Sequence, residues 1–106
     1  MAEALTKKEA FDVIVKILKP FSKNEDALKN ANYNSRVLED LQVNSARLVD
    51  LVIAFEEKLE ITIDDEAAER TRTLGEISDL IVEKSKGLPP EKILELKKKI
   101  KAELGS

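Results

Sequence analysis

The sequence contains no cysteine and no histidine. Without cysteine a chain has no disulfide, no thiolate metal site and no cysteine nucleophile, and without histidine it lacks the usual general base near neutral pH. The sequence also shows no glycine-rich phosphate loop and no general acid and base at a recognisable spacing. We therefore predict that the protein is not an enzyme.

Glycine, proline and aromatic residues are scarce. The 106 residues include three glycines and three prolines, and 4% of the residues are aromatic. Leucine, isoleucine, alanine, glutamate and lysine are abundant instead, which favours helices over strands and tight turns. Because a chain of this length usually forms one core, we predict a small all-α protein.

Long hydrophobic runs are missing as well. The longest run extends from Leu51 to Phe55, whereas crossing a bilayer needs roughly 20 apolar residues. The start of the chain, Met1 to Ala4, does not have a signal-peptide pattern. We predict a cytoplasmic protein with no stable membrane insertion.

The charges are unevenly distributed along the chain, whose formal net charge is −3. Residues 1–43 carry seven basic and seven acidic side chains, residues 44–86 six and eleven, and residues 87–106 five and three. Nucleic-acid binding needs basic residues concentrated on one face, so the overall balance argues against it. The acidic middle segment is predicted to present a surface to basic partners.

Caps and hydrophobic periodicity predict four helices and a fifth at the C-terminus. The expected helices span about residues 7–19, 44–59, 64–72, 73–86 and 90–104. Capping boxes at Thr6 and Thr73 begin two of them, and Asn44 or Ser45 begins the second. Residues 23–42 are polar and rich in asparagine, and they are predicted to form a long loop pinned by scattered apolar side chains.

The C-terminal segment is predicted to be a basic amphipathic extension, residues 87–106, of a helical bundle formed by residues 1–86. The side chains expected to pack on the bundle, or on another subunit, are Ile93, Leu96, Ile100 and Leu104. The lysine cluster Lys97–Lys99 and Lys101 is expected to face water, since such runs are usually solvated faces and only sometimes contact anionic lipid or nucleic acid.

Five features follow one another in order along four stretches of the chain: a loop containing Glu-Asp-Leu, a serine at a helix start, an acidic amphipathic helix, a short connector and a capped helix. These stretches are Leu38–Ala46, Leu48–Glu57, Ile61–Glu66 and Thr73–Ile77. In this order the chain resembles the acyl carrier protein family, over about 75 residues from the first expected helix to the fourth. The resemblance implies an acyl-carrier-type four-helix bundle, to which the fifth helix is an addition.

The resemblance gives Ser45 a role. In acyl carrier proteins the matching serine receives phosphopantetheine from a phosphopantetheinyl transferase, and the thiol of this arm holds acyl groups as thioesters. Such an arm would supply the sulfur that this cysteine-free chain lacks, and a helix N-terminus would favour its phosphodiester. Considered alone, Ser45 before an apolar run would be only an N-cap.

The resemblance therefore implies a carrier of acyl intermediates in fatty-acid or specialised lipid biosynthesis. Two alternatives remain at this stage: an interaction module with the same bundle that is never pantetheinylated, and an aminoacyl carrier. The family usually has Asp-Ser-Leu at the attachment site followed by an acidic residue, whereas this chain has Asn44, Ser45, Ala46 and Arg47. These differences suggest a specialised carrier with dedicated partners.

The resemblance also assigns two groups of residues. Those expected to contact acyl-chain-synthesising or acyl-transferring enzymes, through basic docking patches on the enzymes, are Asn44, Ala46, Arg47, Val49, Asp50, Ile53, Glu56 and Glu57. Those expected to line an acyl-chain pocket, or simply to pack against one another, are Val52, Phe55, Ile61, Ile63 and Ile81.

A further acidic cluster consists of Asp64, Asp65, Glu66 and Glu69. It lacks the spacing and the glycine of a calcium loop. Carboxylates in the first turn of a helix complement the helix dipole, and we assign the cluster this role. We predict no metal site.

Overall fold

The computed structural model describes residues 5–105. Residues Met1–Ala4, whose pattern entered the signal-peptide prediction, lie outside the described residues, as do Ser106 and the side chain of Asp65. Within the described part the regular elements are all helical: α1 (Lys7–Leu18), α2 (Glu25–Lys29), the 3-10 helix η1 (Ser45–Arg47), α3 (Leu48–Leu59), α4 (Asp65–Arg70), α5 (Leu74–Ser85) and α6 (Pro90–Gly105). The predicted all-α class is confirmed.

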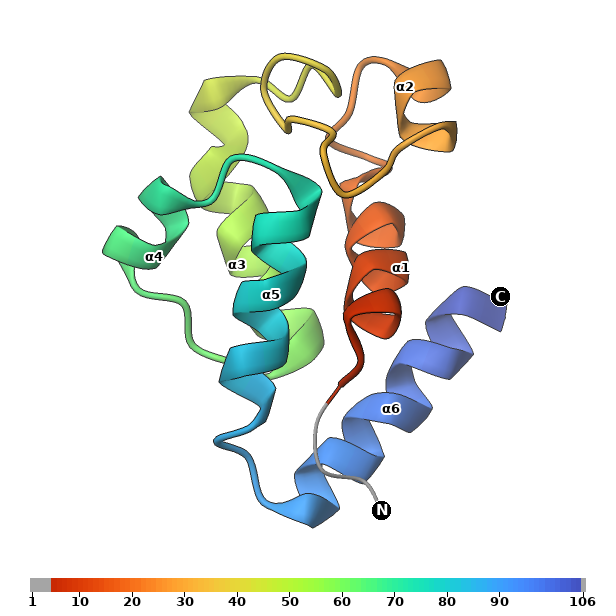
Figure 1. Ribbon diagram of the computed structural model, residues 1–106, viewed down its shortest axis with the longest axis vertical. Coiled ribbons are helices and arrows are strands. Elements are labelled where there is room, and N and C mark those ends of the chain that lie inside the picture. Colours follow the sequence, from red (N-terminus) through yellow and green to blue (C-terminus); the bar gives the residue numbers. More distant parts are fainter. Residues whose placement is uncertain (1–4, 106) are drawn as a thin grey trace.

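Helices α1 and α5 lie side by side at the centre of the molecule, and both begin with the predicted capping box (Figure 1). The Thr6 hydroxyl accepts a hydrogen bond from the Glu9 amide at 3.1 Å, and the Glu9 carboxylate accepts one from the Thr6 amide at 2.9 Å. The pair Thr73 and Glu76 repeats this exchange in α5. These bonds satisfy amides that a helix start otherwise leaves free.

One hydrophobic core joins the helices. Helix α3 contributes Leu51, Phe55 and Leu59, each no more than 3% exposed. The apolar side chains that α1 and α5 bury in the same core are Ala10, Val13, Ile14, Ile17, Leu18, Leu74, Ile77 and Ile81. The spacing of three and four residues that predicted these helices therefore also identifies the faces that pack together.

The segment predicted as a loop contains the short helix α2. Asn24 begins α2 by accepting a hydrogen bond from the Ala27 amide at 3.1 Å. Leu28 is the buried residue of this five-residue helix, so no hydrophobic period could reveal it. After α2 the chain is pinned as expected, because Val37 and Leu41 are buried.

Helix α6 crosses α1 and adds Leu96 and Ile100 to the common core (Figure 1). The buried stripe is shorter than predicted, because Leu104, near the end of the helix, is 42% exposed. Lys97 does not face water freely either, since it is half-buried and its ammonium group lies 3.6 Å from the Glu9 carboxylate. None of the helices between residues 5 and 105 has the length and apolarity that spanning a membrane requires.

One expected helix end also shifts. Helix α4 ends at Arg70, which leaves Arg72 in the connection to α5. There the Arg72 carbonyl accepts a hydrogen bond from the Val37 amide at 3.0 Å, and Arg36 and Thr73 form an isolated antiparallel bridge. The connection is extended because it pairs with the loop that follows α2, and this pairing ties that loop to the start of α5.

Candidate functional site

Ser45 lies at the junction between the pinned loop and α3, and the structure separates its role from that of Asn44. The second expected helix starts with the 3-10 turn η1, and Asn44 is its N-cap: the Asn44 side-chain oxygen accepts a hydrogen bond from the Ala46 amide at 2.8 Å. Ser45 is exposed, and its hydroxyl makes no hydrogen bond to any residue between 5 and 105. The interpretation of Ser45 as the capping side chain is therefore wrong, and its hydroxyl is available for chemistry.

The chain before Ser45 is held at several points. The Val43 side chain is 3% exposed, and the Val43 amide donates to the Val37 carbonyl at 3.2 Å. The Ser22 hydroxyl donates to the Leu41 carbonyl at 2.6 Å. Between them, Gln42 has a left-handed backbone with φ of 54°. This anchoring fixes the direction in which the chain enters η1, and so it presents Ser45 to solvent.

Arg47, in the same short helix as Ser45, is held by an aromatic side chain. Its guanidinium carbon lies 4.4 Å from the centroid of the Phe21 ring, and its Nε lies 4.0 Å from the Asp50 carboxylate. Such a stack favours one position of the cation. Phe21 follows the end of α1 and is half-buried. No local sequence signal pairs it with Arg47.

The predicted partner-binding residues form an outward face of η1 and α3, with one exception. Val49 and Ile53 are 68% and 44% exposed, unusually open for apolar side chains, and Asp50 and Glu57 are exposed beside them. Glu56 is half-buried, and its carboxylate accepts a hydrogen bond from the Ile63 amide at 3.0 Å. Glu56 thus stabilises the turn that follows α3.

The residues assigned to an acyl-chain pocket come together in the core. Phe55, Ile61, Ile63 and Ile81 are buried and belong to one cluster, against which the half-buried Val52 packs. Glu60 ends α3 in a left-handed conformation with φ of 53°, and this sharp turn directs Ile61 back into the core. The five side chains thus contribute to the common core.

Comparison with known proteins agrees with this geometry. The family described as "Phosphopantetheine attachment site" matches residues 27–81, about half of the chain. An acyl carrier protein of Clostridium perfringens is 36% identical over 74 residues, which make up 69% of this chain and 93% of that protein. One of Petrotoga mobilis is 33% identical over 81 residues, 76% of this chain and 92% of the relative.

A further match is the mitochondrial acyl carrier protein of Saccharomyces cerevisiae, 32% identical over 79 residues. That alignment includes 73% of this chain but 63% of the yeast protein, so the chain spans less than two thirds of that relative. The matched domain is a phosphopantetheine attachment site, and proteins of this kind are carriers rather than enzymes. The chain belongs to the acyl carrier protein family.

Proposed function

We propose that this protein carries acyl intermediates as thioesters on a phosphopantetheine arm attached to Ser45. The observation that carries the proposal is the free hydroxyl of Ser45. Asn44 caps η1, so the Ser45 hydroxyl is exposed and makes no hydrogen bond within residues 5–105. An enzyme that transfers the arm can reach this oxygen without breaking the cap.

The surroundings of Ser45 suit a phosphodiester. Arg47 holds a positive charge in the same three-residue helix, positioned by Phe21. A cation near the attachment point favours an anionic group. Because the Arg47 side chain is exposed, the interaction free energy is limited to about 1 kcal/mol or less. The arm, once attached, supplies the thiol that this cysteine-free chain does not have.

The outward face of η1 and α3 is the proposed docking surface for the transferase and for enzymes that synthesise or transfer acyl chains. Val49 and Ile53 supply apolar contact, and Asp50 and Glu57 supply negative charge for basic patches on the enzymes. Arg47 adds a positive charge at the edge of this face. We infer that Arg47 selects partner enzymes that place a carboxylate opposite it. Such selectivity favours a role in a specialised lipid pathway. We propose that the protein acts in the cytoplasm.

Thiol titration tests the proposal, because any thiol on a cysteine-free chain must belong to the arm. The chain is incubated with coenzyme A and a broad-specificity phosphopantetheinyl transferase, purified, and titrated with a thiol reagent. One thiol per chain is expected for the unaltered protein and for Ser35→Ala, and none for Ser45→Ala. Ser35 is a suitable control because it is a serine of the pinned loop that does not belong to η1.

The opposite pattern would refute the proposal. A thiol that persists in Ser45→Ala would place the arm elsewhere. A folded chain that gains no thiol with several transferases would instead favour the interaction module that is never pantetheinylated.

A further inference from the structure

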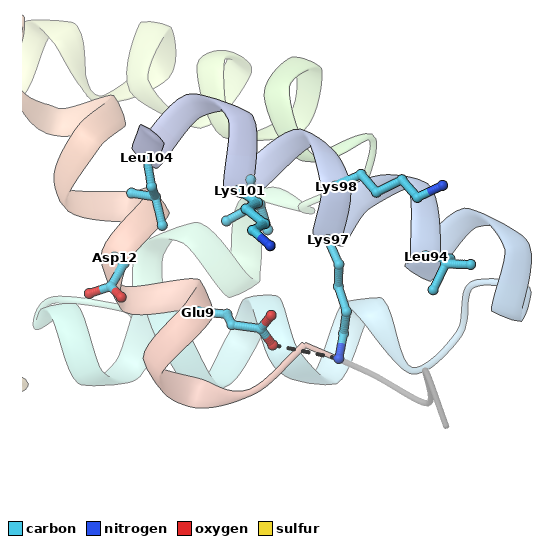
Figure 2. A pocket seen from close by; sticks show the side chains of 8 residues that line it. Glu9, Asp12, Leu94, Lys97, Lys98, Lys101 and Leu104 are labelled. Carbon is cyan, nitrogen blue, oxygen red and sulfur yellow. Dashed lines mark ion pairs between the residues drawn. The ribbon is translucent and has the colours of Figure 1, made fainter. Parts of the chain in front are cut away.

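A groove of about 530 Å³ lies between α1 and α6. Figure 2 shows its two walls: Glu9 and Asp12 come from α1, and a row of leucines and lysines comes from α6. Both walls lie outside residues 27–81, which match the phosphopantetheine attachment domain.

The apolar part of the groove is exposed. Leu94 and Leu104 line it and are 49% and 42% exposed. Ten residues of α-helix separate them, which corresponds to about 15 Å along the axis and roughly 80° around it, so both lie on one side of α6. Ile100 lines the groove between them and is itself buried. The groove therefore offers two accessible apolar contacts about three helical turns apart.

The available charge in the groove is positive. Glu9 is already engaged, with Lys97 at 3.6 Å and with the Thr6 amide at 2.9 Å. Asp12 pairs with Lys8 at 3.0 Å, and this contact raises the pKa of the Lys8 ammonium group. The remaining lysines on the α6 wall are Lys98 and Lys101, both exposed and without an ion-pair partner among residues 5–105. An occupant therefore makes the most favourable electrostatic interaction by placing carboxylates beside these two lysines.

We propose that this groove binds an acidic amphipathic helix of a partner protein. A groove between two helices has no strand edge to pair with an extended peptide, so an apolar occupant must satisfy its own backbone hydrogen bonds, as a helix does. Two leucines about 15 Å apart match apolar side chains that lie about three turns apart on one face of such a helix. Lys98 and Lys101 then select an occupant whose apolar stripe is flanked by glutamate or aspartate.

This surface lies away from the carrier site. Glu103 of α6 pairs at 3.1 Å with Lys58 in the last turn of α3, whereas Ser45 precedes the first turn of α3. The 12 residues of α3 correspond to about 18 Å. The groove and Ser45 can therefore be occupied together, which would let a partner hold the carrier while an enzyme acts at Ser45. Binding in the groove does not require modification of Ser45.

The test uses the full chain, labelled with ¹⁵N, and a synthetic helical peptide whose leucine stripe is flanked by glutamates. The probe should shift resonances of α6 and α1. The double variant Lys98→Glu with Lys101→Glu should bind it roughly tenfold more weakly at low salt, because two exposed attractions become repulsions. The matched control, Lys86→Glu with Lys99→Glu, has the same net charge, alters exposed lysines that do not line the groove, and should retain affinity.

Several results would overturn the proposal: equal weakening in the two double variants, equal binding of a peptide with lysines in place of the glutamates, or shifts confined to α3. Binding of phosphatidylglycerol vesicles through Lys98 and Lys101 without binding of the peptide would make the groove a membrane contact instead. A dimer of the chain that buries Leu94 and Leu104 would identify a second copy as the occupant.

Discussion

Replacing Leu96 by alanine tests whether α6 is part of the folded core. Leu96 is 1% exposed and belongs to the same cluster as the buried side chains of α1, α3 and α5. Truncation of a buried leucine removes its transfer free energy and leaves a cavity, and typically lowers the free energy of unfolding by 2–5 kcal/mol. We expect a loss of about 3 kcal/mol, because α6 packs on one side only and can partly close the space.

Leu94→Ala is the matched control on the same helix. The chemical change and the helix propensity are identical, but Leu94 is 49% exposed, so a change within about 0.5 kcal/mol is expected. Urea denaturation measures the free energy of unfolding of both variants. By thermal unfolding, a loss of about 3 kcal/mol corresponds to a fall in Tm of roughly 10–20 °C for a domain of this size.

Equal unfolding midpoints for the two variants would refute the reasoning. They would mean that α6 contributes nothing to the core and projects from the bundle. Loss of the α6 helix signal at low urea, before the main transition, would likewise contradict a shared core.

Three further predictions concern the loop, acid stability and partner choice. Gly75→Ala should lower the free energy of unfolding, measured by urea denaturation, by more than about 1 kcal/mol, because the Cβ of the alanine would lie 2.8 Å from the Tyr33 carbonyl oxygen. The backbone amides of Arg72 and Thr73 donate hydrogen bonds to the Glu76 carboxylate and lower its pKa from 4.5. The stabilisation from these bonds is present above pH 4.5 and is lost as the pH falls through the lowered pKa. Glu76→Gln should therefore flatten the acid limb of a pH–stability curve, and an unchanged limb would contradict this. Ala46→Leu with Arg47→Asp should raise activity with generic fatty-acid enzymes in a salt-sensitive manner, and equal activity at all salt concentrations would exclude a role in selectivity.

The long helices could be predicted because their sequences carry the signals that form them. The capping boxes at Thr6 and Thr73 and the periodic apolar residues after them are local, and the structure uses them directly. By contrast, α2 has five residues and one buried side chain, which is too little for a periodic signal. Its only local cue is Asn24 before a pair of acidic residues, a pattern that loops share.

Other features of the site could not be predicted from the sequence, because they depend on tertiary contacts. Asn44 and Ser45 are both good capping residues, and only the backbone conformation at the end of the pinned loop decides that Asn44 caps. The stacking of Arg47 on Phe21 requires the segment after α1 to approach η1, which neither residue specifies locally. For Glu56, the bond to the Ile63 amide depends on the turn that Glu60 makes.

The central claim is that Ser45 carries the arm, and peptide mapping of the modified protein tests it most directly. Trypsin cleaves after Arg36 and Arg47, and Ser45 is the only hydroxyl-bearing residue between them. After treatment with coenzyme A and a transferase, mass spectrometry should find the added phosphopantetheine mass on the peptide 37–47. The added mass on any other peptide, or a folded chain that never gains it, would contradict the account.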